Sequence, residues 1–155
     1  MKPINIEAPQ LSYDDGDPDG YRAGGLRIGP LVGASRLGAS LYELPPGQSI
    51  CPYHYEHAEE EWLIVLAGTP SLRHPGGVEP LAPWDVVCFP PGPQGAHKVT
   101  NETDRPARVL MFSDIVFPAV TVYPDSDKIG VFTEGRADNV MVRRSSGVDY
   151  FDGER

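Results

Sequence analysis

The chain has 155 residues, a length that suits one domain with one hydrophobic core. Its formal net charge of −9 leaves no basic face for nucleic-acid phosphates and no attraction to an anionic membrane surface. Because the sequence also has no run of about 20 apolar residues and no signal-peptide core at its N-terminus, we expect a cytoplasmic protein that binds neither nucleic acid nor membranes.

The first 35 residues are predicted to form an irregular arm. Turn-forming residues dominate parts of this segment, for example residues 15–20, where aspartate, glycine and proline follow one another. Over the whole chain, glycine and proline number 17 each and are spread at turn-like intervals. This spread is typical of many short strands joined by turns rather than of a disordered segment.

Residues 36–115 are predicted to form the core of the fold, and residues 116–155 to add C-terminal strands and a tail. The apolar runs are short, and no window of a dozen residues repeats its apolar positions with a helical period. The expected strands cover residues 37–44, 61–67, 71–74, 86–89, 97–101, 108–113, 119–123 and 139–143. Strands of this length and spacing predict an all-β sandwich or barrel that occupies residues 1–155 as a single domain.

The segment that carries most chemical information lies between a Pro-Pro-Gly turn and an apolar strand. It holds His54, Glu56, His57 and Glu61, and a further imidazole, His97, follows a second proline- and glycine-rich turn. Since alternate side chains of a strand share a face, His54 and Glu56 are expected to point together and His57 away from them. Two histidines and a glutamate that converge on strands suit a divalent metal of intermediate hardness.

These residues resemble the two motifs of the cupins. The first motif, a glycine, His-x-His, a glutamate and a second glycine, corresponds here to Gly47, His54, Glu56, Glu61 and Gly68. The second motif corresponds to Pro90, Gly92, His97 and Asn101, with a two-residue insertion between its glycine and its histidine. The resemblance covers about residues 37–113. The chain is similar to small, single-domain bacterial cupins. It implies a double-stranded β-helix, or jelly-roll, barrel that binds one divalent metal ion.

The sequence departs from the cupin pattern at one position. Glu56 stands where cupins usually carry the second histidine of the first motif. Either the strand register is shifted so that His57 is the second metal ligand, or the ligands are His54, Glu56, Glu61 and His97. The second set is favoured because His54 and Glu56 share a face of the strand. Two carboxylates then cancel the charge of a divalent ion, and one unit charge at 4 Å is worth about 4 kcal/mol at an effective dielectric near 20. A second carboxylate ligand favours the binding of harder ions, although the sequence does not distinguish between Mn, Fe, Zn and Ni.

Several smaller features complete the predictions. Cys51 and Cys88 lack a CxxC spacing and are expected to be reduced, buried thiols, with a metal-ligand role for Cys51 as the alternative. Glu59 is expected to be solvated. Trp62 and Trp84 are expected in the core or at a dimer contact.

Three classes of function remain open from the sequence. The cupin resemblance implies a metal-dependent enzyme on a small organic molecule, of dioxygenase, decarboxylase or sugar-isomerase type. A metal-free epimerase or lyase that uses His54 or His97 as a base is the second class, and a non-catalytic module that binds or senses a small molecule is the third. A homodimer is expected from the resemblance and from the edge strands that an open jelly roll must cover.

Overall fold

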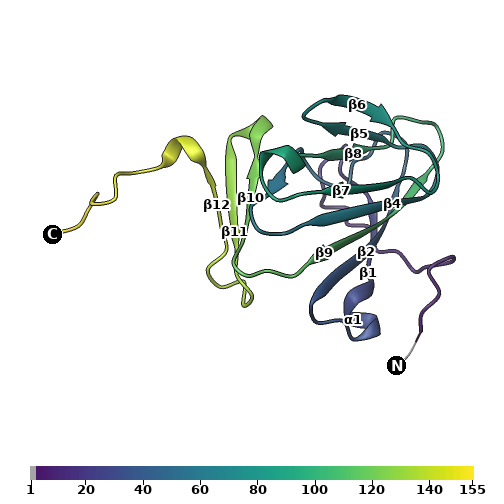
Figure 1. The fold of residues 1–155 in the computed structure, drawn as a ribbon, viewed down its shortest axis with the longest axis horizontal. Coiled ribbons are helices and arrows are strands. Elements are labelled where there is room, and N and C mark those ends of the chain that lie inside the picture. Colours follow the sequence, from purple (N-terminus) through teal and green to yellow (C-terminus); the bar gives the residue numbers. More distant parts are fainter. Residues whose placement is uncertain (1–2) are drawn as a thin grey trace.

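Five antiparallel strands form the larger sheet of the barrel in this computed structural model, which describes residues 3–155 (Figure 1). The spatial order is β1-β2-β9-β4-β7, so the central strand β9 lies between two strands that come much earlier in the sequence. The strand bounds are Gly24–Arg27 for β1, Leu37–Leu44 for β2, Glu61–Ala67 for β4, Val86–Phe89 for β7 and Ala107–Asp114 for β9.

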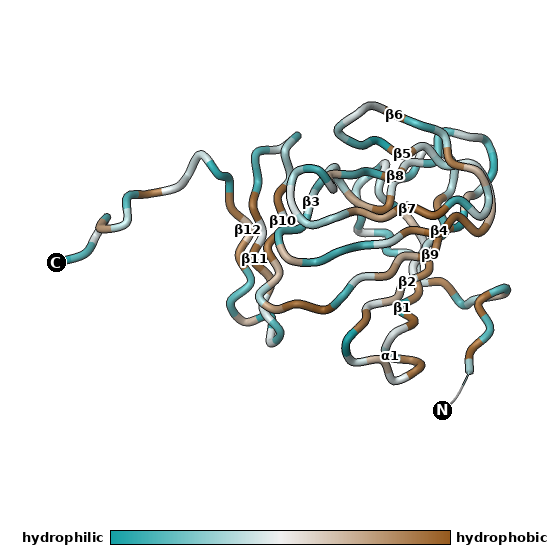
Figure 2. The backbone as a smooth tube through the Cα atoms, viewed as in Figure 1, coloured by the Kyte–Doolittle hydropathy of each residue, from teal (hydrophilic) through white to brown (hydrophobic). Residues whose placement is uncertain are grey.

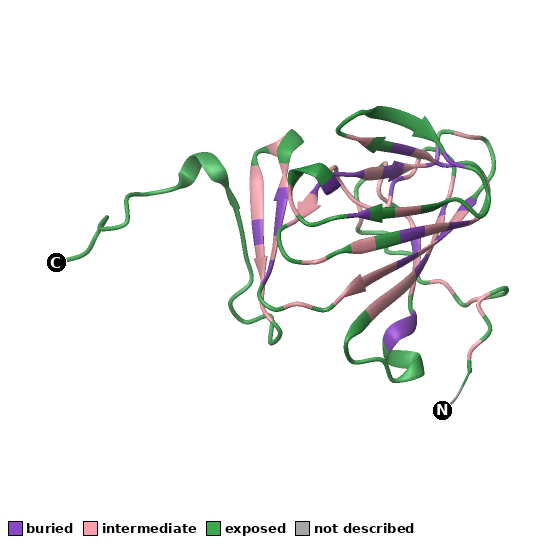
Figure 3. Ribbon diagram, viewed as in Figure 1, coloured by how far each residue is buried: buried purple, intermediate pink, exposed green. Residues whose placement is uncertain are grey.

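Two smaller sheets complete the β structure. The order β6-β5-β8 joins Gly77–Pro80, Ser71–His74 and Lys98–Thr100, and the order β12-β11-β10-β3 joins Val140–Arg143, Lys128–Phe132, Ala119–Tyr123 and Tyr55–Glu56. The four-stranded sheet stands beside the barrel, and the chain beyond β12 extends away from it (Figure 1). Buried residues gather along the barrel strands, whereas β12 and the tail are exposed (Figure 3).

The helical segments are short. Helix α1 covers Ile28–Val32, and three single turns cover η1 Pro93–Gly95, η2 Pro124–Ser126 and η3 Arg144–Ser146. Within residues 3–155, no helix combines the length and the apolar character that a membrane crossing requires.

The core follows directly from strand alternation. Glu61, Leu63 and Val65 of β4 share one face, and Leu63 and Val65 are completely buried with Val109 of the neighbouring β9. The side chain that precedes them on this face, Glu61, is therefore directed toward the barrel interior instead of solvent. An ionised group in such a position needs a partner.

Two residues of the cupin-like motifs have structural tasks next to the chain segment before β9. Gly68 has a φ of +77°, and a Cβ there would lie 2.7 Å from the Ala107 backbone, so only glycine fits. Asn101 is completely buried, and its amide donates to the carbonyl oxygens of Leu44 and Arg105 at 2.8 and 2.7 Å. It thereby ties the end of β2 to the turn before β9.

The predicted all-β class is confirmed, and the predicted strands occur close to their expected bounds. The strands β1, β3, β6 and β11 and the helix α1 were not predicted. Part of the segment expected to be an arm thus pairs with the barrel, as β1 is hydrogen-bonded to β2. These elements are short, and all four residues of β6 are exposed, so their sequences carry no alternation that marks a strand.

Candidate metal centre

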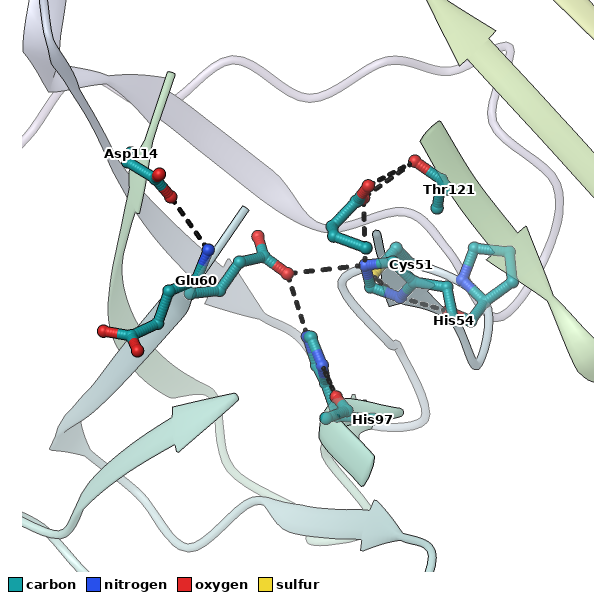
Figure 4. A network of polar contacts seen from close by, with 10 residues as sticks. Cys51, His54, Glu60, His97, Asp114 and Thr121 are labelled. Carbon is teal, nitrogen blue, oxygen red and sulfur yellow. Dashed lines mark hydrogen bonds and ion pairs between the residues drawn. The ribbon is translucent and has the colours of Figure 1, made fainter. Parts of the chain in front are cut away.

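Three side chains from separate parts of the chain converge inside the barrel. His54 and His97 face each other across an isolated bridge, with His54 N–H donating to the His97 carbonyl at 3.1 Å and His97 N–H to the His54 carbonyl at 2.8 Å. Glu61 begins β4, and its Oε2 lies 3.7 Å from His54 Nε2 and 3.5 Å from His97 Nε2. Both labelled imidazoles are directed at this one carboxylate oxygen in Figure 4.

The other nitrogen of each imidazole is held by the backbone. The Nδ1 of His54 is 2.9 Å from the Pro52 carbonyl oxygen, and the Nδ1 of His97 is 2.9 Å from the Gly95 carbonyl oxygen. A carbonyl oxygen can only accept, so each Nδ1 carries a hydrogen. When the ring is neutral, its Nε2 therefore presents a lone pair to Glu61, which is how a metal-binding histidine is normally oriented.

The loop before His97 is shaped for this arrangement. A Cβ at Gly95 would lie 1.9 Å from the Pro90 carbonyl oxygen, which leaves room only for glycine. The ring of Phe89 also stacks on His97, with centroids 3.7 Å apart and planes 9° from parallel. The insertion between the glycine and the histidine of the second motif therefore still delivers a rigidly placed imidazole.

Two atoms of this group have no hydrogen-bond partner among the described residues. Glu61 Oε2 and His97 Nε2 are both buried, and each presents a lone pair to the other at 3.5 Å. Two ligand atoms about 2.1 Å from a common ion lie roughly 3.0 to 3.4 Å apart in octahedral or tetrahedral geometry. A cation between them satisfies both atoms with little movement, so the donor set fits a divalent metal.

Charge coupling within the group is strong. Burial lowers the pKa of His97 to about 4, with the positive charge of His54 acting in the same direction. Burial also lowers the pKa of His54, but the Cys51 thiol and the Glu61 carboxylate outweigh it and raise that pKa to about 11. Burial raises the pKa of Glu61, and the two imidazoles more than compensate, so it falls below its ordinary value. A metal ion held by His54 Nε2 would have to displace the proton of that imidazole.

Glu56 lies beside the three converging side chains. Its Oε1 is 4.0 Å from His54 Nε2, and the Thr121 hydroxyl, 2.8 Å from both carboxylate oxygens, donates to them. Burial raises the pKa of Glu56, against the effect of the Thr121 hydrogen bond. The other candidate, His57, is exposed and stands edge-on to Tyr55, with ring centroids 5.4 Å apart. Thr121 was not identified from the sequence, because only the pairing of β10 with β3 brings it to Glu56.

The cysteines differ from their expected positions, and of the two positions expected for the tryptophans the core is excluded. Cys51 is half-buried with its Sγ 3.5 Å from His54 Nδ1, the ring nitrogen that faces away from Glu61, and Cys88 is exposed on β7. Trp62 and Trp84 are 43% and 74% exposed, so neither belongs to the core. Trp62 lies on β4, between β9 and β7, on the face opposite to that of Glu61, and Trp84 lies in the turn before β7.

A cavity of about 380 Å³ opens beside Glu61. Its polar lining comes from Arg27, Ser40, Tyr42, Glu59, Glu61 and Ser113. Glu59, which was expected to be solvated, is half-buried here, and this burial together with the acidic neighbours Glu56, Glu61 and Asp114 raises its pKa to about 7. The centre is thus connected to a space that can hold a small molecule.

Comparison with known proteins assigns the chain to a family. The profile of the Cupin domain family matches residues 40–113. A sugar phosphate isomerase from a cupin superfamily of Silicibacter pomeroyi superposes with a TM-score of 0.83 at 23% identity, covering 97% of this chain and 98% of that one. The profile match identifies residues 40–113 as a cupin domain, and the superposition shows that the chain shares the fold of that structure.

Two further structures are similar. A protein of Acidithiobacillus ferrooxidans, provisionally named a sugar phosphate isomerase, has a TM-score of 0.77 at 27% identity over 84% of this chain and 81% of that one. A cupin 2 conserved barrel domain protein of Salinispora arenicola has a TM-score of 0.57 at 25% identity, covering 73% and 87%. The comparison with curated protein sequences gave no match.

Proposed function

We propose that this cupin is a metal-dependent enzyme that acts on a small organic molecule in the cavity beside Glu61. One divalent ion is held by His54, Glu61 and His97, with Glu56 as the fourth ligand. The observation that carries the proposal is the pair of buried, unpartnered atoms, Glu61 Oε2 and His97 Nε2, because Glu61 also lines that cavity. When bound, such an ion supplies Lewis acidity to an oxygen of the substrate.

The chain's own residues set the character of the centre. Two imidazoles with fixed Nε2 atoms and two carboxylates give a neutral site for a divalent ion, which favours Mn²⁺ and Fe²⁺ over Cu²⁺ or Ni²⁺. Thr121 holds Glu56 in place, so the fourth ligand can move only by losing a hydrogen bond. Among the enzyme types implied for cupins, the provisional name of the Acidithiobacillus ferrooxidans protein supports the sugar-isomerase type.

Metal analysis tests this function. Protein purified without added metal is analysed for its elements, then stripped with a chelator and titrated with Mn²⁺, Fe²⁺, Zn²⁺ and Ni²⁺ by calorimetry. We expect about one ion per chain and its loss in His97→Ala. A wild-type protein that binds none of the four ions overturns the proposal, and turnover that survives chelation favours the metal-free epimerase or lyase. A copurified metabolite that stays unchanged after metal loading favours a sensing module.

A homodimer is also part of this proposal. Much of β4 and β7 is apolar (Figure 2), and the residues that face away from the Glu61 side include Trp62 opposite Cys88 and Ile64 opposite Val86. Trp62 on β4 and Val86 on the edge strand β7 are 43% and 55% exposed, and a second copy can cover them.

Sedimentation measures this association directly. We expect wild type to sediment as a dimer and Trp62→Glu as a monomer. The matched control Val78→Glu adds the same charge at an exposed apolar position of β6 and should remain dimeric. A monomeric wild type contradicts the expectation.

A further inference from the structure

Arg27 occupies a special position in the cavity wall. It is the last residue of β1 and stands opposite Ser40 in the ladder, while Gly25 stands opposite Tyr42. Tyr42 packs against the core cluster, so alternation places Ser40 and its partner Arg27 on the interior face of the sheet. Arg27, an exposed residue of an edge strand, therefore lines the same cavity as Glu61.

Arg27 also lines a second, open hollow of about 510 Å³. This outer hollow is formed mainly by the end of β11 and the loop after it, including Phe132 and Arg136, and Phe117 lines both spaces. Arg27 and Phe117 thus mark the place where the cavity meets the outer hollow. A ligand that extends outward from Glu61 passes the Arg27 side chain.

The charge of Arg27 is not used within the described part of the chain. Among residues 3–155, its side chain forms no ion pair and no hydrogen bond, in contrast to Arg108 with Glu43 and Arg73 with Asp125. Arg136 on the outer hollow likewise lacks an ion pair within the described part of the chain. In a chain with 22 acidic residues and 13 basic ones, cations left free at a cavity wall are available for an anion from outside.

We infer that Arg27 binds the anionic end group, phosphate or carboxylate, of a substrate whose opposite end lies at Glu61. The inference rests on the proposed function, because it takes the cavity as the substrate site. A guanidinium presents paired N–H donors that match the oxygens of either anion. Since two carboxylates neutralise the proposed metal ion, that ion attracts an anion only weakly, and Arg27 supplies the selectivity that the centre lacks.

Three compounds with similar carbon skeletons test the inference on the full chain loaded with Mn²⁺. Glycerol 3-phosphate and glycerate carry the two kinds of anion, and glycerol carries none. By calorimetry, we expect at least one of the anions to bind about tenfold or more tightly than glycerol, the effect of one charge-assisted pair. Whichever of the two anions binds more tightly shows whether the site prefers a phosphate or a carboxylate group.

The variants separate the role of Arg27 from a general loss of structure. Arg27→Gln should reduce the preference to within about twofold, whereas Arg27→Lys should keep a part of it. The matched control Arg105→Gln removes an equal charge from an exposed turn next to Asn101, away from the cavity. This variant should keep the full preference for the anion over glycerol. An undiminished preference in Arg27→Gln, or a wild type that does not distinguish the anions from glycerol, overturns the inference.

The same titration on His97→Ala separates this inference from the metal proposal. If that variant loses Mn²⁺ and keeps an Arg27-dependent preference for the anion, both proposals stand. If wild type binds no metal but shows the Arg27-dependent preference, the metal enzyme is wrong and the anion site stands. If Mn²⁺ binds and the preference is missing, only the anion site fails.

Discussion

Replacing Glu61 by glutamine tests the proposed centre with the smallest change in shape. The substitution keeps the side-chain volume and removes one negative charge from a position 3.5 and 3.7 Å from the two imidazole Nε2 atoms. At about 4 Å and an effective dielectric near 20, one unit charge contributes about 4 kcal/mol to the binding of a cation. We therefore expect the Kd for Mn²⁺ to rise by roughly a thousandfold.

Calorimetric titration of chelator-treated protein with Mn²⁺ at neutral pH measures this change. Glu59→Gln is the matched control, because it makes the same substitution in the adjoining loop, outside the group formed by His54, Glu61 and His97. A partly exposed charge contributes about 1 kcal/mol or less, so the control should raise the Kd by no more than about fivefold. Circular dichroism of both variants establishes that they are folded.

The reasoning is refuted if folded Glu61→Gln binds Mn²⁺ within about tenfold of wild type. That result means that the carboxylate does not contact the ion, and the buried, unpartnered Glu61 Oε2 then needs another explanation. Equal losses of Mn²⁺ affinity in Glu61→Gln and Glu59→Gln also contradict a direct contact between Glu61 and the ion, since they indicate a general effect of negative charge in this region.

The remaining predictions concern contacts around the centre and the N-terminal segment. Thr121→Val frees the Glu56 carboxylate and should weaken Mn²⁺ binding by about tenfold in the same titration, while unchanged affinity excludes a supporting role. In metal-free protein the folded pKa of Glu59 is about 7, above its ordinary 4.5, so its ionisation lowers stability as the pH rises between these values. Glu59→Gln should therefore melt above wild type at pH 8 and equally at about pH 4, and an equal offset at both pH values contradicts this. Tyr13→Phe removes the hydrogen bond that Tyr13 donates to Glu43 at 2.7 Å and should cost at most about 1 kcal/mol in urea unfolding. Because that hydrogen bond lowers the pKa of Glu43, the deficit should be present at neutral pH and shrink as the pH falls below 4.5, and a deficit that grows in acid counts against the contact.

Local features of the sequence determined a large part of this fold. Strands such as Leu37–Leu44 and Glu61–Ala67 are apolar, bounded by turn residues and long enough to be identified without a partner. The alternation within β4 also placed Glu61 on the same face as Leu63 and Val65, because side-chain direction in a strand depends only on parity. The spacing of the histidines and glutamates led to the cupin resemblance, which the family match at residues 40–113 confirms.

The surroundings of the candidate centre depend on tertiary structure alone. Thr121 reaches Glu56 only because β10 pairs with β3, and the chain between the two strands contains most of the barrel. Arg27 enters the cavity wall only because β1 pairs with β2 in a particular register. Parity tells which residues of one strand share a face, but the choice of partner strand and its register depends on contacts between distant segments. For that reason the sequence by itself determined the chemistry of the four ligand candidates, and only the folded barrel decided which other side chains stand around them.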